Sequence, residues 1–268
     1  LSGARNTGME YLFGRYVMFV DSDDALLPDS LEMMFEHVTD EDLVVGGYNI
    51  YISGVPGREV LPRRIHSYRG EDMNVFYNEN IRKNCEMLDA PWSKIFRRKT
   101  IGNLRFCEDL SYAEDKLFVF NFLAICSSAC TCPFPVYAYH IRSGSLGSDI
   151  VSDRHLMQLR RFLPAYAEVL ASLDRRYPSC RKLNMLYHND IVGRYICRIL
   201  NIFLTRKTQL LDADYLRWIY DMMAADPQQG IFSVRFAQAG NMLLYRIGNI
   251  DLSLKVYRFC SRLTLVLP

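Results

Sequence analysis

The feature that most constrains this chain is a short apolar run that ends abruptly in acidic residues. Residues Arg15–Val20 (RYVMFV) are mostly bulky, β-branched or aromatic, and Asp21-Ser22-Asp23-Asp24 follows at once. A run of this length and composition predicts a buried strand. A buried strand needs neighbours on both sides, yet only a short helix from about Met9 to Leu12 is predicted before it. We therefore expect the printed sequence to begin inside a fold.

The acidic group after this strand is a candidate metal site. Two carboxylates one residue apart, Asp21 and Asp23, can converge on a hard cation such as Mg²⁺ or Mn²⁺. Such a cation usually holds a diphosphate against the protein. The alternative is an ordinary acidic turn in which Asp24 or Asp29 caps the next helix. The spacing by itself leaves both interpretations open.

The remaining pattern divides the chain into an α/β region, residues 1–150, and a helical region, residues 151–268. In the first region, periodicity and turn residues predict alternating elements. We expect a helix from Pro28-Asp29-Ser30 to about Val38, strands over Leu43–Ile52 and Pro135–Ile141, a hairpin or loop over Gly54–Gly70, and helices over Glu71–Asn84 and Tyr112–Ala129. In the second region we expect helices over Arg154–Leu173, Leu183–Thr205, Asp214–Ala225 and Phe232–Leu267.

Composition and charge narrow the class of protein. Half of the residues are apolar and 23% are charged, which excludes a disordered tail, a collagen-like repeat and a disulfide miniprotein. Residues 1–150 hold 15 Lys and Arg against 21 Asp and Glu, whereas residues 151–268 hold 17 against 9. The acidic region suits a divalent cation, and the basic region suits phosphate, an anionic membrane or a second copy of the chain. The net charge of +2 does not indicate nucleic-acid binding.

The eight cysteines lie mostly in apolar stretches, so we expect reduced thiols in a cytoplasmic protein. Cys126, Cys130 and Cys132 form a cluster that we expect to pack in the core, because zinc would need a fourth ligand and no Cys-x-x-Cys pair is present. No apolar run reaches the roughly 20 residues that a membrane span requires.

Four segments, in order, resemble the family 2 glycosyltransferases of the GT-A fold. They are Ala4–Gly8 (ARNTG) with Gly14–Glu32, then Pro91–Arg98 (PWSKIFRR), then Arg105-Phe106 with Tyr112–Asp115, and finally Tyr137–Ser145 (YAYHIRSGS). The order of the four makes the resemblance specific. Haloacid-dehalogenase-type phosphatases also carry Asp-x-Asp after a strand, but Gly followed by Thr or Val usually comes after their second Asp, where this chain has Asp24-Ala25.

The resemblance implies a role for several residues. Asp21 and Asp23 would hold Mn²⁺ or Mg²⁺ and, with Arg5, the nucleotide-sugar donor, while Asp115 would be the general base of an inverting transfer. The implied acceptor-site residues are Trp92, Lys94, Glu114 and Arg142. Core packing is the alternative for Trp92, and a helix N-terminal charge pair is the alternative for Glu114-Asp115. We interpret His140 as a strand residue.

The implied activity is transfer of a sugar, most simply from a UDP-sugar, to a polysaccharide or glycolipid acceptor of the cell envelope. The implied fold is a GT-A-like mixed sheet with a helical C-terminal region. In the family, a strand and a "VDDGSxD" turn that hold the nucleotide precede the ARNxG segment, and this sequence contains neither. We therefore also consider a truncated, non-catalytic module that self-associates.

The expected partners follow from the same considerations. We expect a homodimer, because the edge of an incomplete sheet needs cover. The basic C-terminal helices suit peripheral contact with the inner face of the membrane, and nucleic acid is not an expected partner.

Overall fold

The computed structural model describes residues 1–81, 87–111, 113–141 and 153–185. The chain divides into two compact units. The first comprises residues 1–150 and 160–184, and the second comprises residues 151–159 and 185–268. The helices predicted from Leu183 onward lie almost wholly outside the described residues, so their prediction stands as it is. The account below concerns the first unit.

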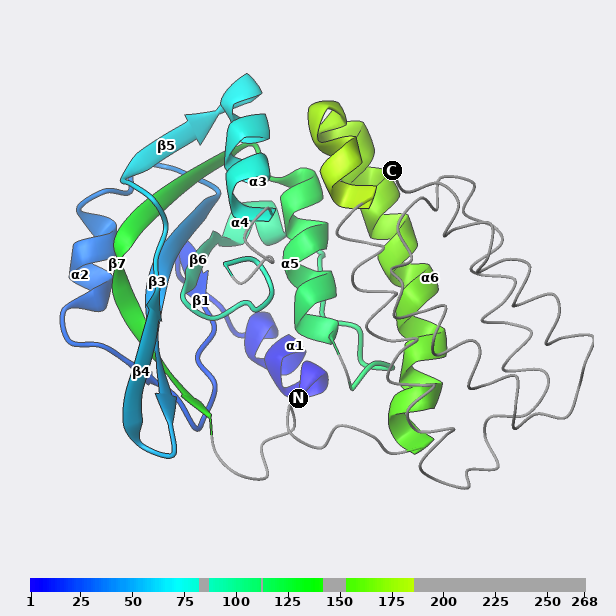
Figure 1. Cartoon of the computed structure of the whole chain (residues 1–268), viewed down its shortest axis with the longest axis horizontal. Helices are drawn as coiled ribbons and strands as arrows, with labels where there is room; N and C mark the ends of the chain where they lie inside the picture. Colours follow the sequence, from blue (N-terminus) through cyan, green and yellow to red (C-terminus); the bar gives the residue numbers. More distant parts are fainter. Residues whose placement is uncertain (82–86, 112, 142–152, 186–268) are drawn as a thin grey trace, which may run out of the picture. The chain divides into compact units, whose positions relative to one another are not determined.

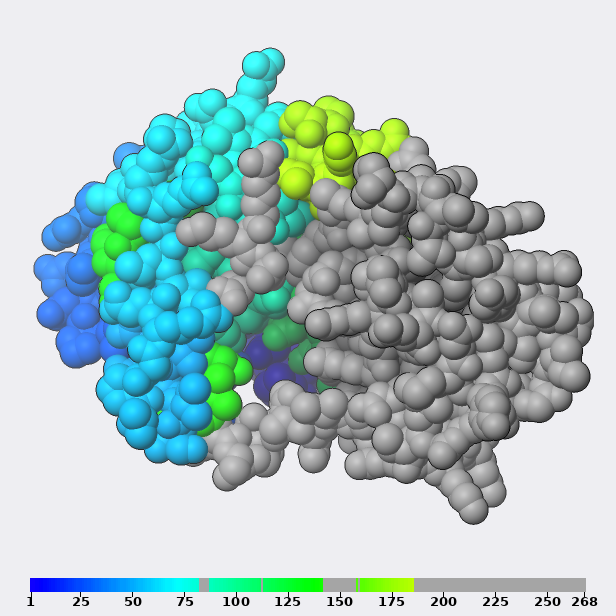
Figure 2. Space-filling view, in the orientation of Figure 1, coloured from blue at the N-terminus to red at the C-terminus, as the bar shows by residue number. Residues whose placement is uncertain are grey.

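A mixed, curled sheet of seven strands organises this unit (Figure 1). The strand order is β1-β6-β3-β7-β2, with β4 paired to β3 and β5 paired to β7. Strands β3 and β7 are parallel, and the other pairs are antiparallel. The strands are β1 (Tyr16–Met18), β2 (Ala25–Leu26), β3 (Leu43–Ile52), β4 (Val55–Val60), β5 (His66–Arg69), β6 (Lys94–Arg97) and β7 (Ser128–Ile141). All but the last residue of β4 are exposed, and the hairpin that β4 forms with β3 is part of the surface in Figure 2.

Helices cover both faces of the sheet, with α2 on one side and α1, α3 and α5 on the other (Figure 1). Their bounds are α1 (Ser2–Glu10), α2 (Ser30–Phe35), α3 (Met73–Ile81), α4 (Arg98–Ile101), α5 (Glu114–Ile125) and α6 (Asp153–Arg176), with short 3₁₀ turns over Gly70–Asp72 and Pro178–Cys180. Among the helices that the structure describes, none combines the length and apolar character needed to cross a membrane.

Helix α5 is mostly apolar, and most of its side chains are buried against neighbouring elements. Toward the sheet, Phe118 and Phe122 meet the ring of Phe96 edge-on, with centroids 5.7 and 5.0 Å apart. Toward α6, Phe120 contacts Tyr166, with centroids 5.9 Å apart. The apolar residues predicted here therefore belong to a core helix. The helix begins at Glu114, close to the predicted start at Tyr112.

Several element boundaries differ from the sequence prediction. The helix expected to continue to Ala129 ends at Ile125, and strand β7 begins at Ser128 rather than Pro135. The cause is Asp42, whose Oδ2 accepts hydrogen bonds from the backbone N–H of Ser127 (2.8 Å) and from its hydroxyl (2.7 Å), which fixes a sharp reversal there. Strands β2 and β6 were not predicted, β4 and β5 lie in the segment expected to be a hairpin or loop, α1 begins earlier than expected and α2 is shorter.

The three clustered cysteines are buried free thiols, as the sequence predicts. The Cys130 thiol lies 3.7 Å from the carbonyl oxygen of His37, inside the layer between β7 and α2. These side chains fill the core, and within the described residues no group of three or more His, Cys, Asp and Glu side chains is arranged to hold a metal ion.

Glu41 provides a test of how the sheet is anchored. It is buried, and its carboxylate accepts hydrogen bonds from the Thr39 N–H (2.9 Å), the Ser67 hydroxyl (2.7 Å) and the Arg69 guanidinium (2.9 Å). Burial alone would raise the pKa of Glu41, but the hydrogen bonds to Ser67 and Thr39 outweigh it and lower the pKa from 4.5 to about 2. The ionised form is therefore stabilised in the folded protein.

We expect Glu41→Gln to lower the free energy of unfolding by about 1.5–3 kcal/mol at pH 7, the usual contribution of hydrogen bonds to a charged group. Because the folded pKa lies below the unfolded one, this contribution is present above pH 4.5 and is lost as the pH falls toward 2. Urea denaturation of both proteins between pH 7 and pH 3 measures the difference. A difference that stays constant over this range would contradict the assignment.

Candidate functional site

The acidic turn Asp21–Asp24 is held against strand β7. The turn closes on itself through a hydrogen bond from the Asp24 N–H to the Asp21 carbonyl oxygen (3.1 Å). The Tyr137 hydroxyl accepts a hydrogen bond from the Asp21 N–H (3.0 Å) and donates one to Oδ2 of Asp24 (2.9 Å). The His140 N–H donates to Oδ1 of Asp24 (2.7 Å). Asp24 thus anchors the turn to β7, and these contacts do not support the alternative in which it caps the next helix.

Helix capping does not explain Asp29 either. Asp29 occupies the N-cap position of α2 with a left-handed backbone (φ 58°), and its side chain makes no capping hydrogen bond. Strand β2 brings the acidic turn beside β7, because Ala25 pairs with Ala138 and Leu26 with Tyr137. This pairing connects residues more than 100 positions apart and places the turn at its anchor.

Arg5 connects the acidic turn to the start of helix α5. Its Nη2 lies 2.7 Å from Oδ1 of Asp21, and its Nη1 lies 3.7 Å from Oε1 of Glu114. The side chain is 8% exposed and its guanidinium lies over the ring of Phe106, 5.1 Å from the centroid. Nη1 is buried and has no hydrogen-bond partner among the described residues. A buried guanidinium N–H in this position is suited to an anionic oxygen.

Asp115 has the properties of a general base. Burial and the neighbouring Glu114 carboxylate raise its pKa from 3.8 to about 6, although the Lys116 N–H and the Arg5 charge oppose the rise. The Lys116 N–H donates to Oδ1 of Asp115 (2.9 Å) and fixes the carboxylate. A base with a pKa near the working pH is ionised and still takes up a proton effectively.

The backbone before α5 is tightly constrained. Ala113 adopts a left-handed conformation (φ 57°), which non-glycine residues adopt only where the surroundings impose it. Asn6 pairs with the backbone of Phe106, because its Nδ2 donates to the carbonyl oxygen (2.9 Å) and its Oδ1 accepts from the N–H (2.8 Å). The sequence patterns indicate no role for Asn6. Its position beside Arg5 in the ARNTG segment was the available signal.

Trp92 and Lys94 lie in the core. Trp92 is 8% exposed, and its ring stacks with those of Tyr137 and Tyr139, with centroids 5.0 and 5.1 Å apart. Lys94 is buried, and its Nζ donates to the Trp92 carbonyl oxygen (3.2 Å). Stacking on a sugar needs an exposed ring face, so the packing alternative describes Trp92 here. The segment contacts the site through Tyr137, and a role of Trp92 and Lys94 toward the acceptor stays a prediction.

Tyr139 shows that the acidic turn and Asp115 share one electrostatic environment. Burial raises the pKa of its hydroxyl, and the charges of Asp24, Asp23, Asp21 and Asp115 raise it further. Sequence reasoning did not single out this residue within the YAYHIRSGS segment. His140 is a strand residue, as expected, and its ring stacks on Tyr51 with centroids 4.8 Å apart. Arg142, an expected acceptor-site residue, lies outside the described residues.

The side chains present suit a cation that is shared with a substrate. Asp21 gives one carboxylate oxygen to Arg5, and its side chain is 26% exposed, while Asp23 lies on the exposed part of the turn. Mg²⁺ typically takes one or two protein carboxylates and completes its coordination with water and substrate phosphates. Two carboxylates on a fixed turn, beside a buried guanidinium, match that requirement rather than an all-protein cage.

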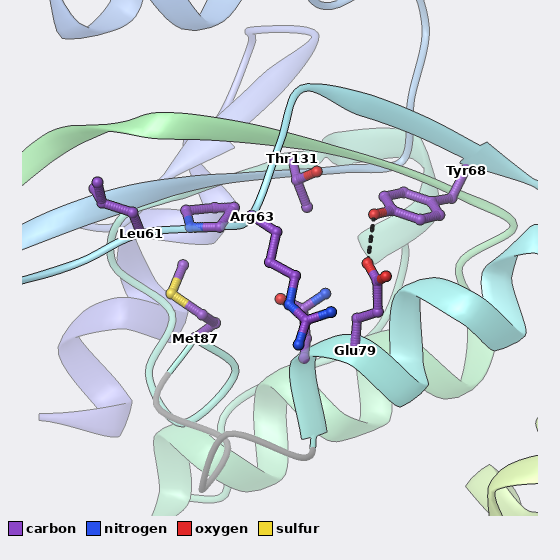
Figure 3. Close-up of a pocket in the computed structure, with 8 residues that line it drawn as sticks. Leu61, Arg63, Tyr68, Glu79, Met87 and Thr131 are labelled. Atoms are coloured by element: carbon purple, nitrogen blue, oxygen red, sulfur yellow. Dashed lines mark hydrogen bonds between the residues drawn. The ribbon is translucent and has the colours of Figure 1, made fainter.

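A separate small pocket lies toward the opposite end of β7, where Thr131 forms part of its wall (Figure 3). Glu79 in this pocket accepts a hydrogen bond from the Tyr68 hydroxyl (3.0 Å) and lies 3.8 Å from the Arg64 guanidinium. The acidic turn meets β7 at Tyr137 and His140, so this pocket belongs to another part of the sheet.

Comparison with known proteins shows what the chain is similar to. Residues 1–104 match the profile of Glycosyl transferase family 2. The chain is 30% identical over 159 residues to glycosyltransferase GlyA of Streptococcus pneumoniae, which covers 54% of this chain and 22% of that protein. It is also 30% identical over 150 residues to the succinoglycan biosynthesis protein ExoO of Rhizobium meliloti, covering 54% of this chain and 43% of that protein. The chain therefore spans less than half the length of these relatives.

The fold resembles that of a solved structure, the 1–349 segment of Staphylococcus aureus TarS. The TM-score is 0.57 at 16% identity, and the match covers 97% of this chain and 71% of that one. The same segment in complex with UDP-GlcNAc matches with a TM-score of 0.54. At this identity the likeness shows a common GT-A-like fold. The family profile and the sequence relatives show that this part of the chain is similar to the family 2 glycosyltransferases.

Proposed function

We propose that this chain acts in a metal-dependent, inverting glycosyltransferase that moves a sugar from a nucleotide-sugar, most simply a UDP-sugar, to a polysaccharide or glycolipid acceptor. The observation that carries the proposal is the position of Arg5. It joins the Asp21 turn, on the proposed donor side, to Glu114 beside the proposed base, Asp115. The names of ExoO and of the TarS complex with UDP-GlcNAc support polysaccharide synthesis and a UDP-sugar donor.

The residues have distinct tasks in this proposal. Asp21 and Asp23 would hold Mn²⁺ or Mg²⁺, which, when bound, neutralises charge on the diphosphate leaving group. The buried Nη1 of Arg5 offers a hydrogen bond to an oxygen of the same leaving group. The Glu114 carboxylate faces the same Nη1, with 3.7 Å between Oε1 and that nitrogen.

The transfer itself is a single displacement at the anomeric carbon. The acceptor hydroxyl oxygen forms a bond to that carbon, while the bond from the carbon to the diphosphate oxygen breaks. The Asp115 carboxylate takes the proton that the acceptor hydroxyl loses, and the electron pair of the broken bond leaves with the nucleoside diphosphate. The raised pKa of Asp115, about 6, suits this uptake of a proton.

A product assay tests the proposal. The protein is incubated with a panel of UDP-sugars and saccharide or glycolipid acceptors, with Mn²⁺ or with EDTA, and release of UDP is measured. We expect acceptor-dependent release that EDTA abolishes. Hydrolysis of p-nitrophenyl phosphate that is lost in Asp21→Asn, without sugar transfer, would favour the phosphatase alternative instead. The homodimer remains a prediction. The membrane contact through the basic C-terminal helices also remains one, because its residues lie outside the described ones: Arg246, Lys255, Arg258 and Arg262.

A further inference from the structure

We propose that Tyr137, acting through Asp24, is a positioning residue that sets the arrangement of Asp21 and Asp23 for the cation. This inference rests on the proposed function, because it concerns the same metal site. It arises from one hydroxyl that touches both ends of the acidic turn. The Tyr137 Oη accepts from the Asp21 N–H and donates to the Asp24 carboxylate, at 3.0 and 2.9 Å.

The geometry fixes the turn at two points with one rigid side chain. Tyr137 is fully buried, and Trp92 stacks on its ring with an interplanar angle of 6°. The hydroxyl therefore has little freedom to follow a moving turn, so the turn must conform to the hydroxyl. The second oxygen of Asp24 is held by the His140 N–H at 2.7 Å, which adds a third connection to the same strand. Asp23 lies between these fixed points and takes its position from them.

The chemistry of the turn divides the acids into two kinds. Asp24 uses both carboxylate oxygens on β7, in hydrogen bonds to Tyr137 and His140. Asp21 is half-buried, with Oδ1 on the Arg5 guanidinium, and Asp23 is exposed. Groups that orient metal ligands by hydrogen bonds typically change metal affinity by about 10–100-fold when they are removed. In a similar way, the hydrogen bonds of Tyr137 and Asp24 hold the turn that carries Asp21 and Asp23.

The structure offers a matched control in Tyr68. It too is a buried tyrosine whose hydroxyl donates to a carboxylate, Glu79, at 3.0 Å, and its strand, β5, also pairs with β7 (Figure 3). Tyr68→Phe removes the same kind of hydrogen bond from another part of the same sheet. A merely structural tyrosine at position 137 would behave as Tyr68 does.

The experiment measures Mn²⁺ binding to the full chain by electron paramagnetic resonance, with and without UDP. We expect Tyr137→Phe and Asp24→Asn each to weaken Mn²⁺ binding by about 10–100-fold, and Tyr68→Phe to leave it unchanged. Thermal unfolding of Tyr137→Phe and Tyr68→Phe should shift by similar amounts. The double variant Tyr137→Phe/Asp24→Asn should weaken binding by less than the product of the two single effects. Both substitutions alter the same hydrogen bond, the one between the Tyr137 hydroxyl and the Asp24 side chain.

The outcomes separate this inference from the proposed function. Wild-type protein that binds Mn²⁺, with Tyr137→Phe binding equally well, overturns the inference and leaves the proposed function standing. Wild-type protein that binds no Mn²⁺ in either condition overturns both. If Tyr137→Phe does not fold, Asp24→Asn decides the question, since a wild-type Mn²⁺ affinity in that variant overturns the inference.

Discussion

Replacing Asp115 with asparagine lowers kcat for sugar transfer by about 10²–10⁴-fold, the usual contribution of a general base, while donor binding is retained. Asparagine keeps the size of the side chain and cannot accept the acceptor proton. The Lys116 N–H that holds Oδ1 of Asp115 at 2.9 Å can still donate to the amide oxygen. The loss should therefore appear in kcat rather than in the affinity for UDP.

The pH dependence gives the same prediction a second readout. Because burial and Glu114 raise the pKa of Asp115 to about 6, the base is ionised above that pH and protonated below it. Wild-type activity should fall tenfold per pH unit well below pH 6, and the residual activity of Asp115→Asn should lack this dependence. Asp109→Asn is the control, because Asp109 is an exposed acid in the segment before α5. An Asp115→Asn variant that keeps more than about a tenth of the wild-type kcat would contradict the assignment.

Replacing Phe118 with alanine lowers the free energy of unfolding by about 3–5 kcal/mol, as expected for truncation of a buried aromatic ring. Phe118 stacks on Phe106 with centroids 4.0 Å apart, and it meets Phe19 edge-on at 5.5 Å and Phe96 at 5.7 Å. These four rings join helix α5, strand β6, the segment before α5 and the segment just before the acidic turn. Removal of the Phe118 ring leaves a cavity that the surrounding elements fill only in part.

Urea denaturation of the wild type, Phe118→Ala and Phe13→Ala measures this effect. Phe13 is 91% exposed, so its truncation should change the free energy of unfolding by no more than about 0.5 kcal/mol. The comparison separates burial from the loss of an aromatic side chain as such. A loss below about 1 kcal/mol for Phe118→Ala would show that these rings do not form the core between α5 and the sheet.

Sequence patterns predicted the elements whose own residues determine them. Strand β3 matches the predicted Leu43–Ile52, because a β-branched and aromatic run with few polar residues forms a buried central strand. The start of α5 at Glu114 matches because acidic residues favour the first turn of a helix. The acidic turn after β1 was also identified from the abrupt change of composition.

Contacts between distant segments could not be predicted in this way. Asp24 is bound by Tyr137 and His140, which lie 113 and 116 positions away along the chain. Nothing in the local pattern distinguishes Asp24 from Asp23, so the helix cap stayed open as an alternative for it. For Trp92 the sequence left an acceptor role and core packing open for a similar reason, since only the positions of Tyr137 and Tyr139 show that its ring is buried. The early part of β7 was missed because Asp42 ends the preceding helix from across the sheet.

The most direct test of the central claim is titration calorimetry of UDP into the full chain, with and without Mn²⁺. The titration is repeated on Asp23→Ala and on the control Asp29→Asn, which alters an exposed acid at the start of α2 that makes no capping hydrogen bond. We predict UDP binding that requires Mn²⁺, is lost in Asp23→Ala and is unchanged in Asp29→Asn. A folded protein that binds no UDP in the presence of Mn²⁺, or one whose binding survives Asp23→Ala, would contradict the account.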